Sequence, residues 1–266
     1  MTNVEFLQNE LFSRYGNVKR ARGCFLYTAK GERITDLYQE NGRAVLGWGG
    51  SSAFTMFKNT MNRGLTGSFC TDYSYRTLRA IEKLFDSKRE VFYFSSKEKA
   101  LKSAALISPE EISVYKPWSP YQTKWSEIDC IIFAPALSWA ENIYILAVKK
   151  EIADKVFSDG KLFSSEAVIP APLHAGITRS IYDLIKALQE REEKDWFLYD
   201  TVLTKYWERK GPYLFSKVPA EKYKDFALHC LDCGILVNPD IKEPSIVPFG
   251  ADKGVFTKLK NNPFEF

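Results

Sequence analysis

The chain has 266 residues, of which 45% are apolar and 26% are charged, a composition typical of an ordinary soluble globular protein. Its formal net charge of +4 is small, and Lys and Arg are scattered among Asp and Glu, which argues against nucleic acid as a partner. The longest apolar run, residues 131–140, contains a proline and is too short to cross a bilayer, so we expect no membrane segment.

The first half of the chain alternates predicted helices and strands. The amino-terminal segment MTNVEFLQNELFSRYG has helical apolar spacing and lacks the layout of a secretory signal, so we expect a cytoplasmic protein. The stretch CFLYTAKGERITDLY alternates around Gly31, which can adopt the positive φ of a hairpin turn. A strand at 91–94 leads into a helix that begins at Lys97, with Ser95 and Ser96 as candidate caps.

The second half continues the alternation. Residues 111–118 are predicted to form a strand that ends at Pro117. The stretch DCIIFAPALSWAENIYILAVKKEIAD, residues 129–154, indicates a buried strand, a loop, a second strand and the start of a helix. Pro172 suits the first turn of a long helix with an apolar stripe. Shorter strands and helices follow, so the sequence predicts an α/β architecture with a second, α+β subdomain.

The cysteines are odd in number and unevenly spaced, which is not the pattern of a disulfide framework. The segment HCLDCG places His229 beside Cys230 and Cys233. A zinc site needs four ligands, however, and the other histidine, His174, lies in a separate predicted helix. We therefore expect no metal site and interpret these cysteines as small apolar residues on the inner face of a helix.

The order of these segments resembles the class III aminotransferases, which belong to fold type I of the enzymes that use pyridoxal phosphate. GCFLYTAKGERITDLYQENGRAVLGWGG is similar to the opening hairpin of that family, and VFYFSSKEKALKSAALI to the strand, turn and helix that hold the cofactor phosphate. The stretch 129–154 aligns without a gap with the segment that carries the catalytic lysine, and VIPAPLHAGITRSIYDLI and CGILVNPDIKEPSIVPF are similar to later family segments.

The resemblance covers most of the chain in the right order and implies the domain organisation. It predicts a truncated large domain at residues 51–170, with a mixed, mostly parallel sheet and helices on both faces. Residues 1–50 together with 171–266 are predicted to supply the amino-terminal hairpin, a linking helix and an α+β small domain.

The position-by-position match places Pro135 where the family has its Schiff-base lysine. Proline has no primary amine, so the covalent anchor and the proton-shuttling base are both missing, and we expect no catalytic residue. Ser95, Ser96 and Lys97 correspond to the phosphate turn with its glycine replaced, and we interpret them as a vestigial cofactor-binding turn. Ala167 stands where the family has a threonine that reaches the phosphate across the dimer interface.

Two further departures concern the sheet and the substrate side. Only a short connection joins Ile107 to Asp129, where the family has several strands and the acidic residue that pairs with the pyridine nitrogen. Residues 112–118 are expected to cover the sheet edge that this deletion leaves. The closing strand at 245–248 lacks the arginine that grips a substrate carboxylate in the family.

The resulting hypothesis is a degenerate class III aminotransferase-fold protein, a pseudoenzyme without transaminase activity, with an assembly, regulatory or ligand-binding role. We expect no cofactor, and binding of pyridoxal phosphate without a covalent link is left open. The alternative is an active pyridoxal-phosphate enzyme with a relocated lysine, Lys97 or Lys161. The resemblance implies a homodimer, with a heteromer that includes an intact aminotransferase as the second arrangement.

A third hypothesis is an unrelated activity in the old cleft. Aromatic residues in segments expected near that cleft offer flat rings for stacking, and we favour a volume-filling role for them: Trp118, Tyr121, Trp125 and Trp139. His174 is a candidate acid or base, although a lone histidine near the first turn of a helix is more often structural or solvent-facing.

Overall fold

The computed structural model describes residues 2–49, 52–119, 124–140, 142–158 and 164–266. The chain divides into two compact units. Unit 1 comprises Met1–Gly50, Trp118–Pro120 and Glu190–Phe266, and unit 2 comprises Ser51–Pro117 and Tyr121–Gln189. The boundary between the units near residue 190 differs from the sequence-based boundary at 170/171, because helix α6 (Ala171–Glu190) is grouped with unit 2.

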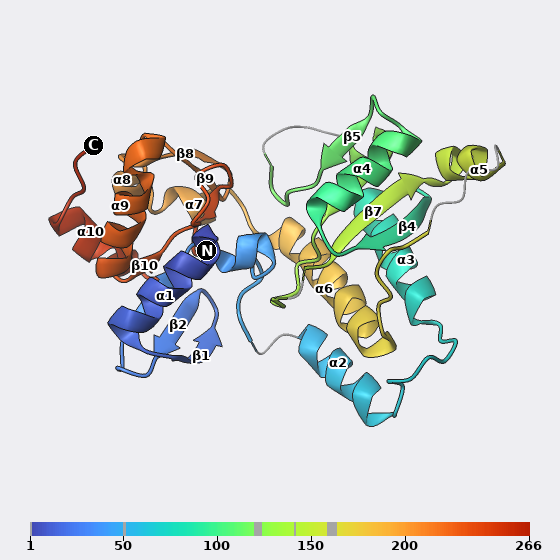
Figure 1. Ribbon diagram of the computed structural model, residues 1–266, viewed down its shortest axis with the longest axis horizontal. Helices are drawn as coiled ribbons and strands as arrows, with labels where there is room; N and C mark the ends of the chain where they lie inside the picture. The colour runs from blue at the N-terminus through green and yellow to red at the C-terminus, as the bar shows by residue number, and fades with distance from the viewer. Residues whose placement is uncertain (1, 50–51, 120–123, 141, 159–163) are drawn as a thin grey trace. The chain divides into compact units, whose positions relative to one another are not determined.

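Unit 2 is built on a four-stranded sheet with the order β4-β7-β6-β5 (Figure 1). Its strands are β4 (Arg89–Phe94), β5 (Ile112–Val114), β6 (Cys130–Phe133) and β7 (Tyr144–Lys149). β7 is antiparallel to both β4 and β6, whereas β5 pairs parallel to β6. The sheet is therefore mixed, as predicted, but the prediction of a mostly parallel sheet is wrong, because β7 is antiparallel to both of its neighbours and only β5 and β6 pair in parallel. β5 pairs with β6 at the edge of the sheet and comprises only the first three residues of the segment 112–118 that was expected to lie there.

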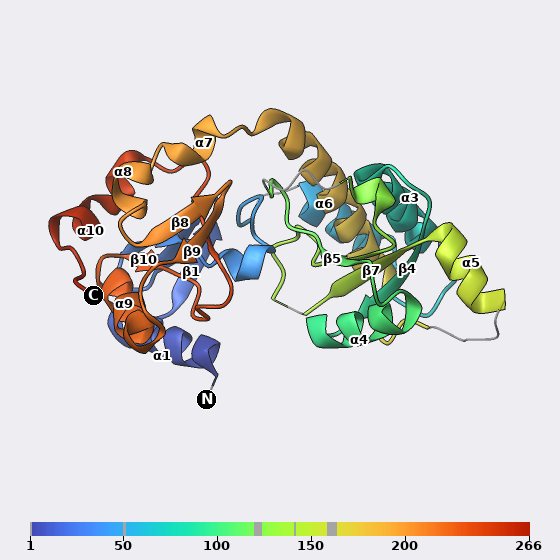
Figure 2. The same ribbon diagram turned by 90° about the horizontal axis from the view of Figure 1, so that it is seen from above.

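Helices cover both faces of this sheet, as Figure 2 shows. Alternate residues of the strands, such as Phe92, Ile132 and Leu146, form one buried cluster with Ala100 and Ala104 of the helix that crosses this face. The intervening residues of β4 and β6 contact the helices of the opposite face. The helices of unit 2 are α2 (Ser52–Asn62), α3 (Tyr73–Phe85), α4 (Lys97–Ile107), α5 (Lys150–Ser158) and α6, with a 3₁₀ turn η2 (Trp125–Glu127).

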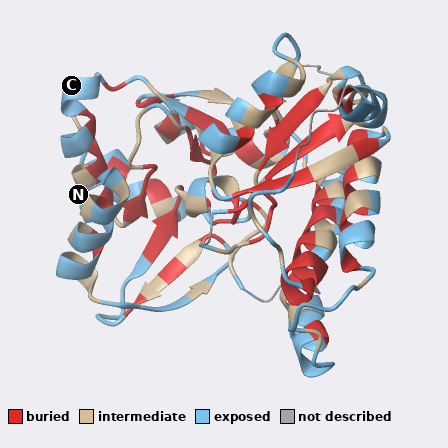
Figure 3. Ribbon diagram, turned by 45° about the vertical axis from the view of Figure 1, so that its right-hand side comes forward, coloured by how far each residue is buried: buried red, intermediate tan, exposed pale blue. Residues whose placement is uncertain are grey.

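Burial follows from the sequence of the central strands. All four residues of β6 are buried, and only the two end residues of β7 are not (Figure 3). A strand that is covered on both faces needs a continuous apolar run, and the segments CIIF and YILAVK supply it. The predicted strand, loop, strand and helix of residues 129–154 are thereby confirmed.

Unit 1 contains two small sheets. The first has the order β1-β2-β3-β10 and the second the order β11-β9-β8. The strands are β1 (Val18–Arg22), β2 (Phe25–Thr28), β3 (Arg33–Asp36), β8 (Trp207–Lys210), β9 (Tyr213–Ser216), β10 (Ile235–Leu236) and β11 (Ser245–Ile246). The helices are α1 (Asn3–Tyr15), α7 (Lys194–Phe197), α8 (Asp200–Leu203), α9 (Ala220–Asp232) and α10 (Thr257–Asn261), with 3₁₀ turns η1 (Gln39–Gly42) and η3 (Lys253–Phe256).

Local chemistry explains where several elements begin and turn. Thr2 and Glu5 form a capping box at the start of α1. Gly31 has a φ of 82° between β2 and β3, as the predicted hairpin requires. Ser96 is the N-cap of α4, and its hydroxyl accepts from the Lys99 N–H at 3.3 Å. Among the described residues, no helix combines the length and the apolar character that a bilayer crossing requires.

Candidate functional site

The turn between β4 and α4 is the predicted phosphate site. Ser95 is exposed there, while Ser96 and Lys97 are half-buried. The first N–H groups of α4 make the helix end favourable for an anion, and the Ser96 hydroxyl satisfies one of them. The turn therefore has a geometry that attracts negative charge.

A carboxylate from a distant part of the chain already occupies this turn. Glu166 forms an ion pair with the Lys99 ammonium group, and its carboxylate accepts from the Ser95 hydroxyl at 3.3 Å. The backbone N–H groups of Glu166 and Ala167 both donate to the Tyr93 carbonyl at 3.0 Å, which anchors the segment beside β4. The hydrogen bond from Lys99 is the main cause that lowers the pKa of Glu166.

Pro135 lies at the same end of the sheet as this turn. β4 and β6 run in the same direction on either side of β7, so Ser95 and Pro135 both follow the carboxyl ends of their strands. Two strands with one strand between them are about 10 Å apart. Pro135 is buried and offers no amine to this end of the sheet.

Two features at this end of the sheet bear on pyridoxal phosphate. Covalent attachment needs a lysine amine, and proline occupies the position that the family resemblance assigns to it. A phosphate group needs hydrogen-bond donors and positive charge that are not already paired with an anion. At this turn the Glu166 carboxylate already contacts Ser95 and Lys99. Of the two sequence-based lysine candidates, Lys97 begins α4 and Lys161 lies outside the described residues.

His174 has a structural role within unit 2. It lies on α6 with only 7% of its surface exposed, so the expectation of a solvent-facing residue is wrong and that of a structural residue is confirmed. Its Nδ1 is 2.9 Å from the Thr77 hydroxyl, and its ring packs edge-to-face on Tyr93 with a centroid separation of 5.2 Å. Burial lowers the pKa of the imidazole to about 4, so it is neutral at pH 7.

The candidate aromatic residues do not form one stack in the described structure. Trp118 belongs to unit 1 and packs edge-to-face on Trp196, with ring centroids 5.7 Å apart. Trp125 contacts Tyr115 on the edge side of the unit 2 sheet, with centroids 4.9 Å apart. Trp139 packs instead on the aromatic rings of α2, and Tyr121 lies outside the described residues. These separate contacts support a volume-filling role.

The cysteines of the HCLDCG segment face the interior of unit 1. Cys230 is fully buried on α9 and Cys233 is 5% exposed just after it, and burial raises the pKa of both thiols. His229 Nε2 lies 2.8 Å from the Asn262 carbonyl. In the described parts of the chain, no group of three His, Cys, Asp or Glu side chains is arranged to hold a metal ion.

Sequence reasoning missed the residues that decide this site. Glu166 and Lys99 carry no motif, and 67 positions separate them along the chain. The one available signal was the N-terminus of α4, which favours a nearby negative charge. The sequence predicts that an anion is favoured at the start of α4. It does not show whether that anion is a carboxylate of the same chain or a bound ligand.

Comparison with solved structures shows that the chain has an aminotransferase-like fold. The ornithine aminotransferase of Plasmodium yoelii aligns with a TM-score of 0.64 and 14% identity over 98% of this chain and 97% of that chain. The Plasmodium falciparum ornithine δ-aminotransferase gives 0.66 and 13% over the same shares. Acetylornithine aminotransferase from Elizabethkingia anophelis gives 0.63 and 12% over 98% of each chain. At these identities the similarity concerns the fold alone.

Comparison with curated proteins finds relatives of uncharacterized function. A Treponema pallidum protein is 29% identical over 286 residues, which covers 92% of this chain and 93% of the relative. A Borreliella burgdorferi protein is 24% identical over 250 residues, 91% of this chain and 88% of the relative. No protein-family profile matches the chain.

Proposed function

We propose that this protein is a degenerate aminotransferase-fold protein that lacks transaminase activity and has an assembly, regulatory or ligand-binding role. The observation that carries the proposal is the Glu166 carboxylate, which contacts Ser95 and Lys99 at the start of α4. A phosphate placed there would meet a like charge in place of an open anion site. Pro135, at the position of the lysine in the family resemblance, supports the same conclusion.

The proposal extends to pyridoxal phosphate, which we propose the protein does not use as a covalent cofactor. Incubation with pyridoxal phosphate, borohydride reduction and peptide mass spectrometry should show only sparse modification, spread over exposed lysines. The reason is that no lysine stands at the position of Pro135 and that Lys99 is held in an ion pair. Saturable, stoichiometric modification of one lysine, such as Lys97 or Lys161, would instead establish the relocated-lysine enzyme.

A variant of Glu166 provides the matched control. Glu166→Gln removes the charge and keeps the shape, so inorganic phosphate should bind this variant about threefold or more tightly than the original chain. Glu151→Gln, an exposed residue of α5, should leave phosphate binding unchanged. Equal phosphate affinity of the Glu166 variant and the original chain would mean that Glu166 does not block the turn.

We also propose a homodimer, as the resemblance implies, formed through the α2–α3 side of unit 2. Large apolar or aromatic side chains are exposed there, with Met61 47%, Phe69 61% and Tyr75 62% exposed. Tyrosine, phenylalanine and methionine are enriched at protein–protein interfaces. Light scattering of the purified chain should therefore give about twice the 30.5 kDa mass of one chain.

Surface variants test the location of this interface. Tyr75→Glu should shift the mass towards the monomer, because it places a charge on the proposed contact surface. Phe157→Glu on α5, whose side chain is 37% exposed, should leave the mass unchanged. A monomeric mass at all concentrations, with dimerisation only after an intact aminotransferase is added, would favour the heteromer.

A further inference from the structure

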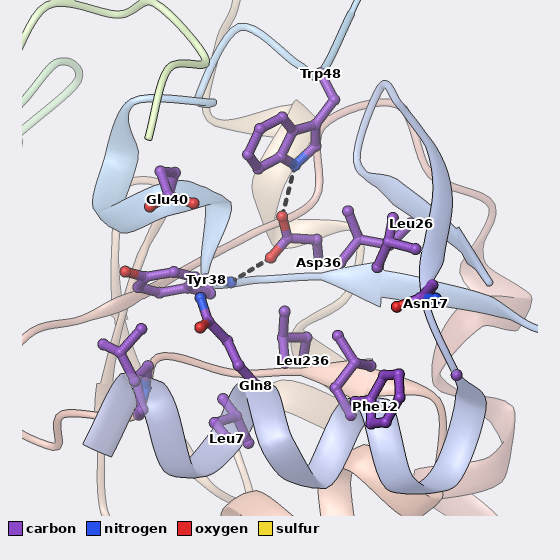
Figure 4. A pocket seen from close by; sticks show the side chains of 15 residues that line it. Leu7, Gln8, Phe12, Asn17, Leu26, Asp36, Tyr38, Glu40, Trp48 and Leu236 are labelled. Atoms are coloured by element: carbon purple, nitrogen blue, oxygen red, sulfur yellow. Dashed lines mark hydrogen bonds between the residues drawn. The ribbon is translucent and has the colours of Figure 1, made fainter. Parts of the chain in front are cut away.

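Unit 1 contains a cavity of about 320 Å³ between α1 and the sheet that includes β2, β3 and β10 (Figure 4). Its walls are mainly apolar, because one face of α1 and the facing strands supply large side chains: Leu7, Leu11, Phe12, Leu26 and Leu236. This volume lies at the lower end of the range of small-molecule sites. The cavity is thus large enough for a compact organic ligand and too small for a folded partner.

The polar centre of the cavity is Asp36, the last residue of β3. It is 1% exposed and belongs to the residues that line the cavity. It accepts from the backbone N–H of Tyr38 at 2.9 Å and from the Trp48 indole N–H at 2.7 Å (Figure 4). It also accepts from the backbone N–H of Gln39 at 2.9 Å. All three donors are neutral, so they orient and solvate the carboxylate without cancelling its charge.

A second carboxylate reaches the cavity from a turn with unusual backbone geometry. Gln39, Glu40 and Asn41 have φ values of 46°, 49° and 57°, a left-handed conformation that side chains other than glycine rarely adopt. Tertiary contacts hold the turn, since the Asn41 side chain accepts from the Asn238 amide at 3.2 Å. The turn places Glu40 in the cavity lining, and strained backbone of this kind is often found at binding sites.

The charged residues in the described lining of the cavity have one sign. The described lining residues include Asp36 and Glu40 and no Lys, Arg or His. Burial is the main cause that raises the pKa of both carboxyl groups, that of Asp36 to about 6, and the charge of Asp36 adds to the rise at Glu40. Arg43 partly offsets the effect at Glu40. A cation in the cavity would relieve the repulsion between the two carboxylates.

We propose that this cavity binds a small organic amine, with its ammonium group at Asp36 and Glu40 and its apolar body against the leucine and phenylalanine side chains. The apolar walls suit such a body, and the described lining has only two carboxylates, with no third His, Cys, Asp or Glu side chain beside them to hold a metal ion. Gln8 and Asn17 in the lining offer further polar contacts to the ligand. The site is independent of the proposed loss of transaminase activity, since Ser95, Pro135 and Glu166 all belong to unit 2.

Calorimetry on the full chain with 2-phenylethylamine tests this proposal, and 2-phenylethanol serves as the neutral isostere. The amine should bind and shift the Trp48 indole N–H resonance, which is assigned among the six tryptophans by its loss in Trp48→Phe. The alcohol should bind at least about tenfold more weakly, because it cannot pair with a buried carboxylate. Equal affinity for the two compounds, or no detectable binding of the amine, would overturn the proposal.

Charge-removing variants locate the contact. Glu40→Gln should weaken amine binding about threefold to tenfold, and Asp36→Asn about tenfold or more. Asp225→Asn, an exposed residue of α9 outside the cavity, should leave binding unchanged. Unchanged amine affinity in folded Asp36 and Glu40 variants would contradict the assignment of the amine to these carboxylates. If Asp36→Asn fails to fold, Glu40→Gln and the pH series test the assignment instead.

The pH series uses the raised pKa of Asp36. The ionisable groups near it are Glu40, which Arg43 also contacts electrostatically, the phenol of Tyr38, and Cys24 just before β2, whose raised pKa of about 11 keeps it a thiol. Lowering the pH from 7 to 5 should weaken amine binding about tenfold, because protons compete for a carboxyl group that titrates near pH 6. An affinity that does not change over this range would contradict a role for Asp36.

Discussion

Replacement of Arg89 by methionine is expected to lower the free energy of unfolding of unit 2 by about 3–5 kcal/mol. Arg89 begins β4 and is 1% exposed. Its guanidinium group donates to the carbonyls of Trp125 at 2.7 Å, Ile128 at 2.6 Å and Asp129 at 3.2 Å. These carbonyls belong to the short connection that enters β6, so Arg89 holds this connection against the start of β4.

The magnitude follows from the groups that the substitution leaves behind. Each part-buried carbonyl that loses its charged donor costs about 1–3 kcal/mol, and methionine can fill the space without supplying any N–H. The Asp129 carbonyl keeps the N–H of Lys149 at 2.9 Å, so the loss falls mainly on the carbonyls of Trp125 and Ile128. Arg89 keeps its positive charge although burial lowers its pKa, because the carbonyl oxygens compensate part of the lost hydration. The substitution therefore removes several hydrogen bonds at one position.

Urea unfolding followed by circular dichroism measures this effect. Arg76→Met is the matched control, since Arg76 is 54% exposed and pairs with Asp72 on the surface of α3, where such a pair contributes below about 1 kcal/mol. Arg89→Lys should fall between the two, because an ammonium group cannot reach all the carbonyls at once. A loss below about 1 kcal/mol for Arg89→Met would show that the connection holds without this side chain.

Acidification from pH 7 to pH 5 is expected to destabilise unit 2 by about 2 kcal/mol through His174 alone. The folded-state pKa of His174 is about 4, whereas the ordinary pKa of an unburied histidine is 6.5. The unfolded chain therefore binds more protons between these values, and stability is lost as the pH falls below about 6.5. Amide hydrogen exchange in β6 and β7 measures the change within this unit.

The variant His174→Gln should remove most of this pH dependence while it keeps a hydrogen-bonding group near Thr77. His229→Gln on α9, whose side chain is half-exposed, is the control and should keep the slope. Asp36 of unit 1 acts in the opposite direction, because its pKa is raised from 3.8 to about 6 and stability falls as the pH rises between these values. A slope in β6 and β7 that persists after His174→Gln would place its origin elsewhere.

Local sequence patterns were sufficient for the elements that depend on neighbouring residues. Gly31 marked the hairpin, Ser96 marked the start of α4, and the apolar runs of residues 129–154 marked two strands. The strand β1 was missed because its sequence VKRAR has no apolar alternation, and it forms by pairing with β2 at the edge of the sheet. Its existence depends on the partner strand more than on its own residues.

From the sequence alone we also predicted that a proline occupies the position of the lysine in the family resemblance. The serines before α4 were likewise predicted from the sequence. Only the tertiary structure brought Glu166 to Ser95, Arg89 to the carbonyls before β6, and Trp48 to Asp36. Each of these contacts joins polar groups from segments that fold against one another, and polar residues leave no periodic signal along the chain. A polar group that becomes buried costs free energy unless it forms a hydrogen bond. Which partner it bonds therefore depends on which segments the fold places beside it.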